Sequence, residues 1–168
     1  MTSANNSAEC PPRAEMQRLQ PMAGVFRAEV TIPIEPGKEL TLTGTMTSTF
    51  QLGGDFLHQD YLGDALPDWP SRFMGKGYWG FNPATGLYEG FWIDNASKMM
   101  QVETGTVDAS GKIWTMVSEF VHPANGQKIK KRSVIAVADN NHHRLDAFTT
   151  DISGRESPQM SIKYSRAS

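Results

Sequence analysis

The chain has 168 residues, a mass of 18.6 kDa and a formal net charge of −2, with a sequence pI near 6.1. Hydrophobic residues make up 39% and charged residues 20%, which argues against a disordered or membrane-embedded chain, and the slight acidity argues against a nucleic-acid or anionic-membrane partner. Cys10 is the one cysteine, so an intramolecular disulfide and a multi-cysteine metal site are excluded.

The start of the chain predicts a tail and a short helix. Residues 1–14 are polar and include Pro11 and Pro12, with no basic start followed by an apolar run, so we expect a flexible tail, no secretory signal and a cytoplasmic protein. Residues 15–168 are expected to form one domain. Residues 15–22 predict a helix of about two turns, which must plug or lie against something larger because it is too short to stand alone.

From Gly24 onward, apolar and polar residues alternate with a period of two, which is typical of strands. The threonines of residues 39–52 occupy one face of that segment and its apolar residues the other. Ten strands are predicted, at residues 26–34, 39–52, 56–62, 72–82, 87–94, 98–107, 112–122, 127–138, 144–152 and 159–166.

The short connections between these segments indicate an antiparallel meander, because a parallel crossover needs a dozen or more residues. An open sheet of ten strands would leave two edges and one bare face. We therefore predict an all-β fold: a closed or nearly closed antiparallel up-and-down barrel of about 8–10 strands, with the short helix at one end. A two-sheet sandwich is the alternative. Barrels of this size can enclose one small ligand.

Several segments resemble the family called domain of unknown function 1579. They are residues 52–57, 73–77, 80–82, 90–95, 104–108 and 160–166. The resemblance spans nearly the whole domain and implies a lipocalin-like, calycin-like β-barrel, but it supplies no catalytic residues. His58, Trp79 and Glu89 depart from the expected pattern, which indicates either a pocket particular to this chain or sequence drift.

Four ionisable side chains are candidates for acid–base catalysis. His58 and Asp60 share a strand face about 7 Å apart, so the carboxylate can orient the imidazole and raise its basicity. Glu89 and Glu119 are strand carboxylates that would acquire different pKa values if they met inside a barrel. The alternative for all four is a solvent-exposed position. For His58 and Asp60, this means that Gln59 and Tyr61 point inward instead.

Aromatic residues are dense between residues 69 and 92 and predict either an apolar ligand site or ordinary core. The candidate ligand-binding residues are Tyr61, Phe73, Tyr78, Trp79 and Trp92.

The remaining histidines and the basic run suggest no further site. His142 and His143 are adjacent, face opposite ways on a strand and are expected in solvent. Haem binding through His58 or His122 is a remote alternative. Residues 128–132 are basic and are interpreted as the solvent face of a strand. Phosphate-loop, nucleophile-elbow and zinc motifs are absent from the sequence, so no cofactor or metal is expected.

Two functions are compatible with this pattern. The first is binding of a small, largely apolar or aromatic molecule inside the barrel. The second is a cofactor-independent isomerase, lyase or cyclase that uses an acid–base pair in the same cavity. Ionisable groups that point inward would favour the enzyme, because burying them is costly. A homodimer stays open as a further partner.

Overall fold

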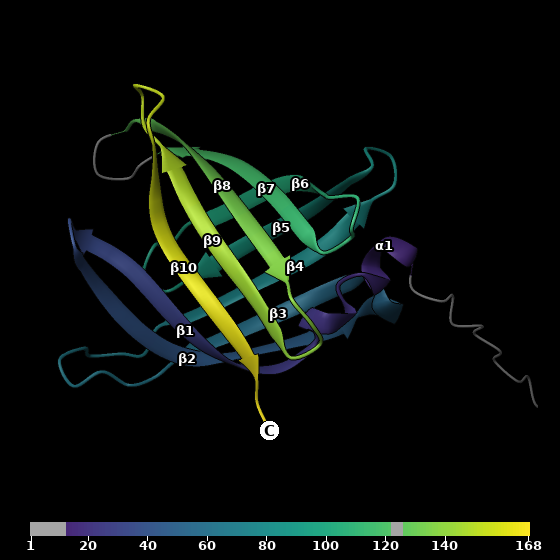
Figure 1. Cartoon of the computed structure of the whole chain (residues 1–168), viewed down its shortest axis with the longest axis horizontal. Coiled ribbons are helices and arrows are strands. Elements are labelled where there is room, and N and C mark those ends of the chain that lie inside the picture. The colour runs from purple at the N-terminus through teal and green to yellow at the C-terminus, as the bar shows by residue number, and fades with distance from the viewer. Residues whose placement is uncertain (1–12, 122–125) are drawn as a thin grey trace, which may run out of the picture.

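The computed structural model describes residues 13–121 and 126–168, which form a closed antiparallel barrel of ten strands (Figure 1). The strands are β1 (Gly24–Glu35), β2 (Lys38–Gln51), β3 (Phe56–Gly63), β4 (Met74–Asn82), β5 (Leu87–Asp94), β6 (Met100–Val107), β7 (Ile113–Val121), β8 (Lys128–Val137), β9 (His142–Thr150) and β10 (Glu156–Arg166). Each strand pairs with the next in sequence, and β1 pairs with β10 to close the barrel. The predicted barrel is confirmed, and the sandwich is excluded.

Short helical segments lie at one end of this barrel and before β3. They are α1 (Ala14–Gln17) and the 3-10 segments η1 (Gln20–Met22) and η2 (Leu52–Gly54). The single helix predicted over residues 15–22 is therefore two pieces, and Pro21 lies in the first turn of the second, where its ring fits better than in a helix interior. None of the helices within residues 13–121 and 126–168 is long and apolar enough to cross a membrane.

The alternation in the sequence decides which side chains fill the barrel. In β1, Phe26, Ala28 and Val30 are buried while the residues between them are exposed or half-buried. The threonines of β2 lie on the outer face, opposite the buried Met46 and Ser48. Period two thus sorts the strand residues into an inner and an outer set.

The N-terminal segment plugs one end of the barrel. Met16, Leu19 and Met22 recur every third residue and are almost wholly buried. They pack against inward-facing residues from β3 to β8, namely Leu57, Trp79, Tyr88, Trp114, Met116, Ile135 and Val137. The Tyr88 hydroxyl donates a hydrogen bond of 2.8 Å to the carbonyl oxygen of Glu15. The predicted plug is confirmed, and its stability comes from this packing.

Arg166, near the C-terminus, fastens the plug to the barrel. Its guanidinium donates hydrogen bonds to the carbonyl oxygens of Ala23 (3.0 Å), Pro21 (3.1 Å) and Asn140 (2.8 Å). The same group lies over the ring of Phe26, 4.5 Å from its centroid. The first and last parts of the domain therefore meet at the plugged end. The predicted tail, residues 1–14, lies almost entirely outside the described residues.

Strand β10 begins earlier than the alternation predicts. It starts at Glu156 rather than at residue 159, and its register against β9 shifts between Pro158 and Met160. Proline has no N–H to donate to the ladder, and a bulge accommodates it. The alternation is interrupted there, which is why the sequence places the strand too late.

Candidate functional site

The structure places His58 and Asp60 on the outer face of β3. Leu57 and Tyr61, on the opposite face, are the buried residues of that strand. The His58 ring packs against the ring of Tyr78 at 4.7 Å, and Asp60 accepts a hydrogen bond of 2.7 Å from exposed Lys76. The alternative orientation, with Gln59 and Tyr61 inward, is the one observed.

The two glutamates predicted as strand carboxylates also lie on the outer surface of the barrel, and they are not close to each other. Glu89 on β5 is exposed and accepts a hydrogen bond of 2.7 Å from the Asn82 amide. Glu119 on β7 is exposed and pairs with Lys130 at 3.6 Å. The barrel does not bring these carboxylates together, because β6 lies between their strands.

The predicted aromatic residues divide between the two faces. Tyr61, Trp79 and Trp92 belong to the inward-facing sets of β3, β4 and β5. Phe73, just before β4, packs beside Tyr61 with ring centroids 5.7 Å apart. Tyr78 lies on the outer face, where its ring also contacts Phe91 at 5.5 Å. The interior thus receives four of the five predicted ligand-binding residues.

Trp92 lies flat on the inner wall because two glycines make room for it. A Cβ atom at Gly75 or Gly77 would collide with the indole ring of Trp92. The ring remains half-buried, unlike Trp114 at the plugged end, which is fully buried. These glycines therefore position an aromatic surface inside the barrel.

His143 is buried, so the expectation that both adjacent histidines lie in solvent is wrong for this one. Its ring stacks on Tyr164 at 4.3 Å and meets the edge of Phe26 at 4.6 Å. Burial lowers the pKa of His143 to about 4, and the nearby Arg166 cation acts in the same direction. Its neighbour His142 is exposed and pairs with Asp139 at 3.0 Å.

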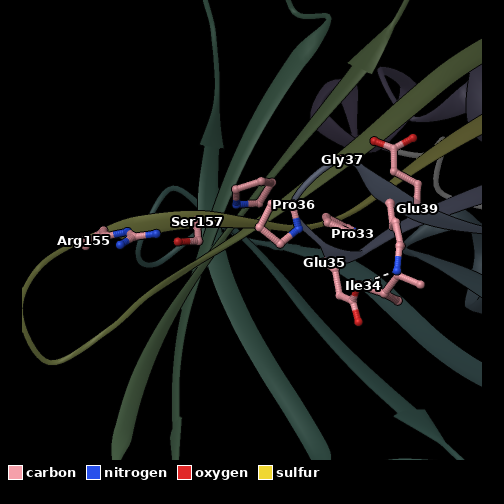
Figure 2. A pocket seen from close by; sticks show the side chains of 10 residues that line it. Pro33, Ile34, Glu35, Pro36, Gly37, Glu39, Arg155 and Ser157 are labelled. Carbon is pink, nitrogen blue, oxygen red and sulfur yellow. Dashed lines mark hydrogen bonds and ion pairs between the residues drawn. The ribbon is translucent and has the colours of Figure 1, made fainter.

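Two clefts mark the places where neighbouring strands separate at the end opposite the plug. The first, of about 640 Å³, lies between the β1–β2 hairpin and the start of β10; Figure 2 shows its prolines and Arg155. The pairing of β1 with β10 ends at Thr31 opposite Ser161, and both strands continue beyond it. Figure 1 shows the β1–β2 and β9–β10 hairpins diverging there. This end of the barrel wall is therefore less continuous than the plugged end.

The second cleft, of about 630 Å³, lies where β6 and β7 separate. Their pairing runs from Thr104 opposite Val117 to Val107 opposite Trp114, and residues 100–103 of β6 lie beyond it. Most of its lining residues, such as Val102, Val117 and Arg132, lie on the outer faces of their strands. Ser118 on β7 and Lys131 on β8 line it as well. By the alternation of their strands, both of these side chains belong to the inward-facing set.

Behind this second cleft lies an interior polar group made of Gln101, Glu103, Lys131 and Ser133. The Lys131 ammonium donates to the Gln101 amide oxygen at 3.3 Å, and the Ser133 hydroxyl donates to a Glu103 carboxyl oxygen at 3.4 Å. Both hydrogen bonds join β8 to β6 across the inner face of β7. Gln101, Glu103 and Lys131 are half-buried although they face inward, which shows that side chains do not fill the interior here.

The electrostatics of this group are set by its depth in the barrel. Burial raises the pKa of Glu103 above its ordinary value, while Lys131 and the Ser133 hydroxyl oppose that shift. The Glu103 side chain lies over Gly90, where a Cβ would be 3.7 Å from its Cγ atom. The group can therefore present a cation, an amide and a carboxyl of raised pKa to a bound molecule.

This interior polar group is not among the sites predicted from the sequence. The predicted solvent-facing position of residues 128–132 is wrong for Lys131. The sequence does contain a signal for the inward position of Lys131. Ile135 and Val137 are alternate apolar residues, and counting back along the strand in steps of two from them reaches Ser133 and then Lys131. In residues 100–107 the more apolar face, with Met100 and Val102, lies on the outside of the barrel. The usual assumption that the apolar face of a strand points inward therefore predicts the wrong orientation for this strand.

No cluster of three metal-ligating side chains occurs within the part of the chain that the structure describes. Of the two remote haem candidates, His58 faces outward and His122 lies outside the described residues.

A family profile described as "Protein of unknown function (DUF1579)" matches residues 11–166. The chain belongs to this family. A search of curated proteins finds no match.

Two solved structures resemble this family member in fold. Rv2717c from M. tuberculosis is 14% identical with a TM-score of 0.66, and covers 94% of this chain and 99% of its own. The S-type phycobiliprotein lyase CPES from Guillardia theta is 10% identical with a TM-score of 0.60, with the same two coverages. At these identities the likeness shows the barrel fold alone.

Proposed function

We propose that this barrel binds a small, largely apolar organic molecule inside the end opposite the plug. The observation that carries the proposal is the half-buried state of inward-facing side chains there, Trp92, Gln101 and Lys131 among them. An inner wall that stays partly exposed in a closed barrel leaves room for a ligand. The aromatic face of Trp92 beside a few polar groups is the composition typical of small-molecule sites.

The arrangement of the two ends supports a single ligand chamber. The plug fills the other end with tightly packed apolar side chains, so a molecule is expected to enter from the end where the clefts lie. Half-buried Phe73, Leu42 and Met160, which pack against the same core cluster as Trp92, contribute apolar surface to the wall. Burial of an apolar ligand against such a wall is favourable by roughly 25 cal/mol per Å² removed from water.

The first test is native mass spectrometry of freshly purified protein, followed by titration with the dye 1-anilinonaphthalene-8-sulfonate and its displacement by apolar compounds. Gln101→Trp places a large ring inside the barrel, whereas Met100→Trp places the same ring on the exposed outer face of the same strand. We expect Gln101→Trp to weaken dye binding at least tenfold and Met100→Trp to leave it unchanged. Equal effects of the two variants would reject an interior site.

A second candidate function is acid–base catalysis on the same bound molecule. It is favoured by Glu103, an inward-facing carboxyl whose pKa is raised by burial, as suits a general acid. Once mass spectrometry has identified a bound compound, incubation in D₂O would reveal proton exchange at its carbon atoms. We expect exchange with the native chain and its loss in Glu103→Gln at unchanged binding. Binding without exchange would leave the barrel a carrier.

A further inference from the structure

We propose that the molecule bound in this barrel is an apolar carboxylic acid, and that Lys131 and Gln101 hold its carboxylate. This inference rests on the proposed function and specifies its ligand. It is carried by the geometry of the interior polar group, in which a cation and an amide face inward together.

The hydrogen-bond donors of these two residues exceed their acceptors. A lysine ammonium has three N–H donors, and within the described residues Lys131 uses one of them, toward the Gln101 amide oxygen. The Gln101 NH₂ group then remains to donate. A carboxylate accepts hydrogen bonds through two oxygens, so it complements this set, whereas a ligand amine would not.

Lys131 also makes no direct ion pair with a carboxylate among the described residues, although Lys130 and Arg132 on either side of it have carboxylate partners. Glu103 is close enough for the Lys131 cation to lower its pKa against the effect of burial, but its carboxyl accepts the hydrogen bond from Ser133 and is not within ion-pair distance of the ammonium. An inward-facing cation without a direct carboxylate partner is costly in a partly desolvated site, and a ligand carboxylate would offset that cost.

The surroundings of Lys131 leave space for a carboxylate head group. Its register partners are Ser118 on β7 and Thr149 on β9, which are short side chains with hydroxyl donors. Gln101 is in turn the register partner of Trp92 on β5. The polar head of the ligand would thus lie between β6 and β8 while its apolar part runs along the indole of Trp92.

The apolar part comes from one of two sources, an alkyl chain or an aromatic ring. Dodecanoate and 2-naphthoate represent them, and methyl dodecanoate and methyl 2-naphthoate are the matched neutral probes. Isothermal titration of the full chain at pH 7 would compare the four. We expect the preferred acid to bind at least tenfold more tightly than its ester. Tighter binding of dodecanoate would identify the apolar part as an alkyl chain, and tighter binding of 2-naphthoate would identify it as an aromatic ring. Equal binding of acid and ester would overturn the inference and leave the proposed function standing.

Two lysine variants test the assigned cation. Lys131→Met removes the inward charge, and Lys128→Met removes an exposed charge from the outer face of the same strand. We expect Lys131→Met to lose at least tenfold in affinity for the acid and little for the ester, and Lys128→Met to change neither. Lys131→Arg, which keeps the charge, should retain the preference.

Three outcomes of these titrations separate the two proposals. If Lys131→Met binds the acid as well as the native chain does, the inference is wrong. If Lys131→Met does not fold, the acid-to-ester ratio of the native chain and of Lys131→Arg decides. If none of the four probes nor the dye binds the native chain, the proposed function itself fails.

Discussion

At the plugged end of the barrel, apolar side chains from the N-terminal helical segments and from β3, β4, β5, β7 and β8 fill the interior, whereas the inward-facing residues at the opposite end include an ammonium, an amide and a carboxyl. Trp114 and Trp92 illustrate the contrast. The first is fully buried, and the second lies over two glycines and stays half-buried. The comparison indicates that the plugged end is more completely packed, and that the proposed ligand would lie at the opposite end beside the second core cluster, which includes Tyr61 and Ile162.

The largest test of this division compares the two tryptophans. Trp114→Ala removes a fully buried ring from the plugged end and should lower the free energy of unfolding by about 3–5 kcal/mol, as large aromatic truncations in cores do. Trp92→Ala should cost about half as much, because part of its ring is already exposed. Urea unfolding followed by circular dichroism measures both. An equal loss would mean that the two ends are packed alike.

Acid should weaken the plugged end through His143. Its pKa is about 4 in the folded chain against an ordinary value of 6.5, so between these values the unfolded chain binds the extra proton. Stability from this histidine is complete above pH 6.5 and is lost as pH falls toward 4, by about 3 kcal/mol in all.

The matching variant is His143→Phe, which keeps a ring beside Tyr164 but cannot be protonated. It should flatten the dependence of unfolding free energy on pH between 4 and 6.5, while exposed His142→Ala should leave that dependence nearly unchanged. Urea titrations at pH 4.5 and 7.5 would show the difference. A slope like that of the native chain in His143→Phe would assign the acid sensitivity to other groups.

The fastening of the plug by Arg166 gives a smaller effect. Arg166→Met keeps some packing on Phe26 but leaves the carbonyl oxygens of Pro21 and Ala23 without their donor. We expect a loss of about 2 kcal/mol in unfolding free energy, typical of hydrogen bonds to a charged group. Limited proteolysis should then cut first within residues 13–23. A global loss of stability without faster cleavage there would argue against a local fastening role.

The fold followed from sequence because ten alternating segments with short connections leave few arrangements other than a closed antiparallel barrel. The plug followed from the spacing of Met16 and Leu19 on a helix too short to stand alone. These are local patterns, and tertiary structure preserved them.

The site did not follow, because it depends on which face of each strand points inward. In β3, Phe56 and Leu62 on one face are as apolar as Leu57 and Tyr61 on the other, so the pattern did not decide the orientation. Lys131 was hidden within a basic run whose other members point outward. Orientation is set by closure of the barrel, in which each strand's parity follows from its paired neighbours.

The smallest expected effect lies at the end opposite the plug and concerns Glu103. Its raised pKa means that the folded chain holds a proton more tightly than the unfolded chain, so stability from this group falls as pH rises through that window. Glu103→Gln keeps the hydrogen bond with Ser133 and removes the ionisation. It should therefore unfold at a higher free energy than the native chain at pH 7, and the difference should shrink as pH falls. Exposed Glu119→Gln, which loses only its pairing with Lys130, should be neutral or slightly destabilising.

If Glu103→Gln is instead less stable than the native chain at pH 7, Glu103 is an ionised partner of Lys131. The cation is then already neutralised, and the preference for a ligand carboxylate should disappear with it.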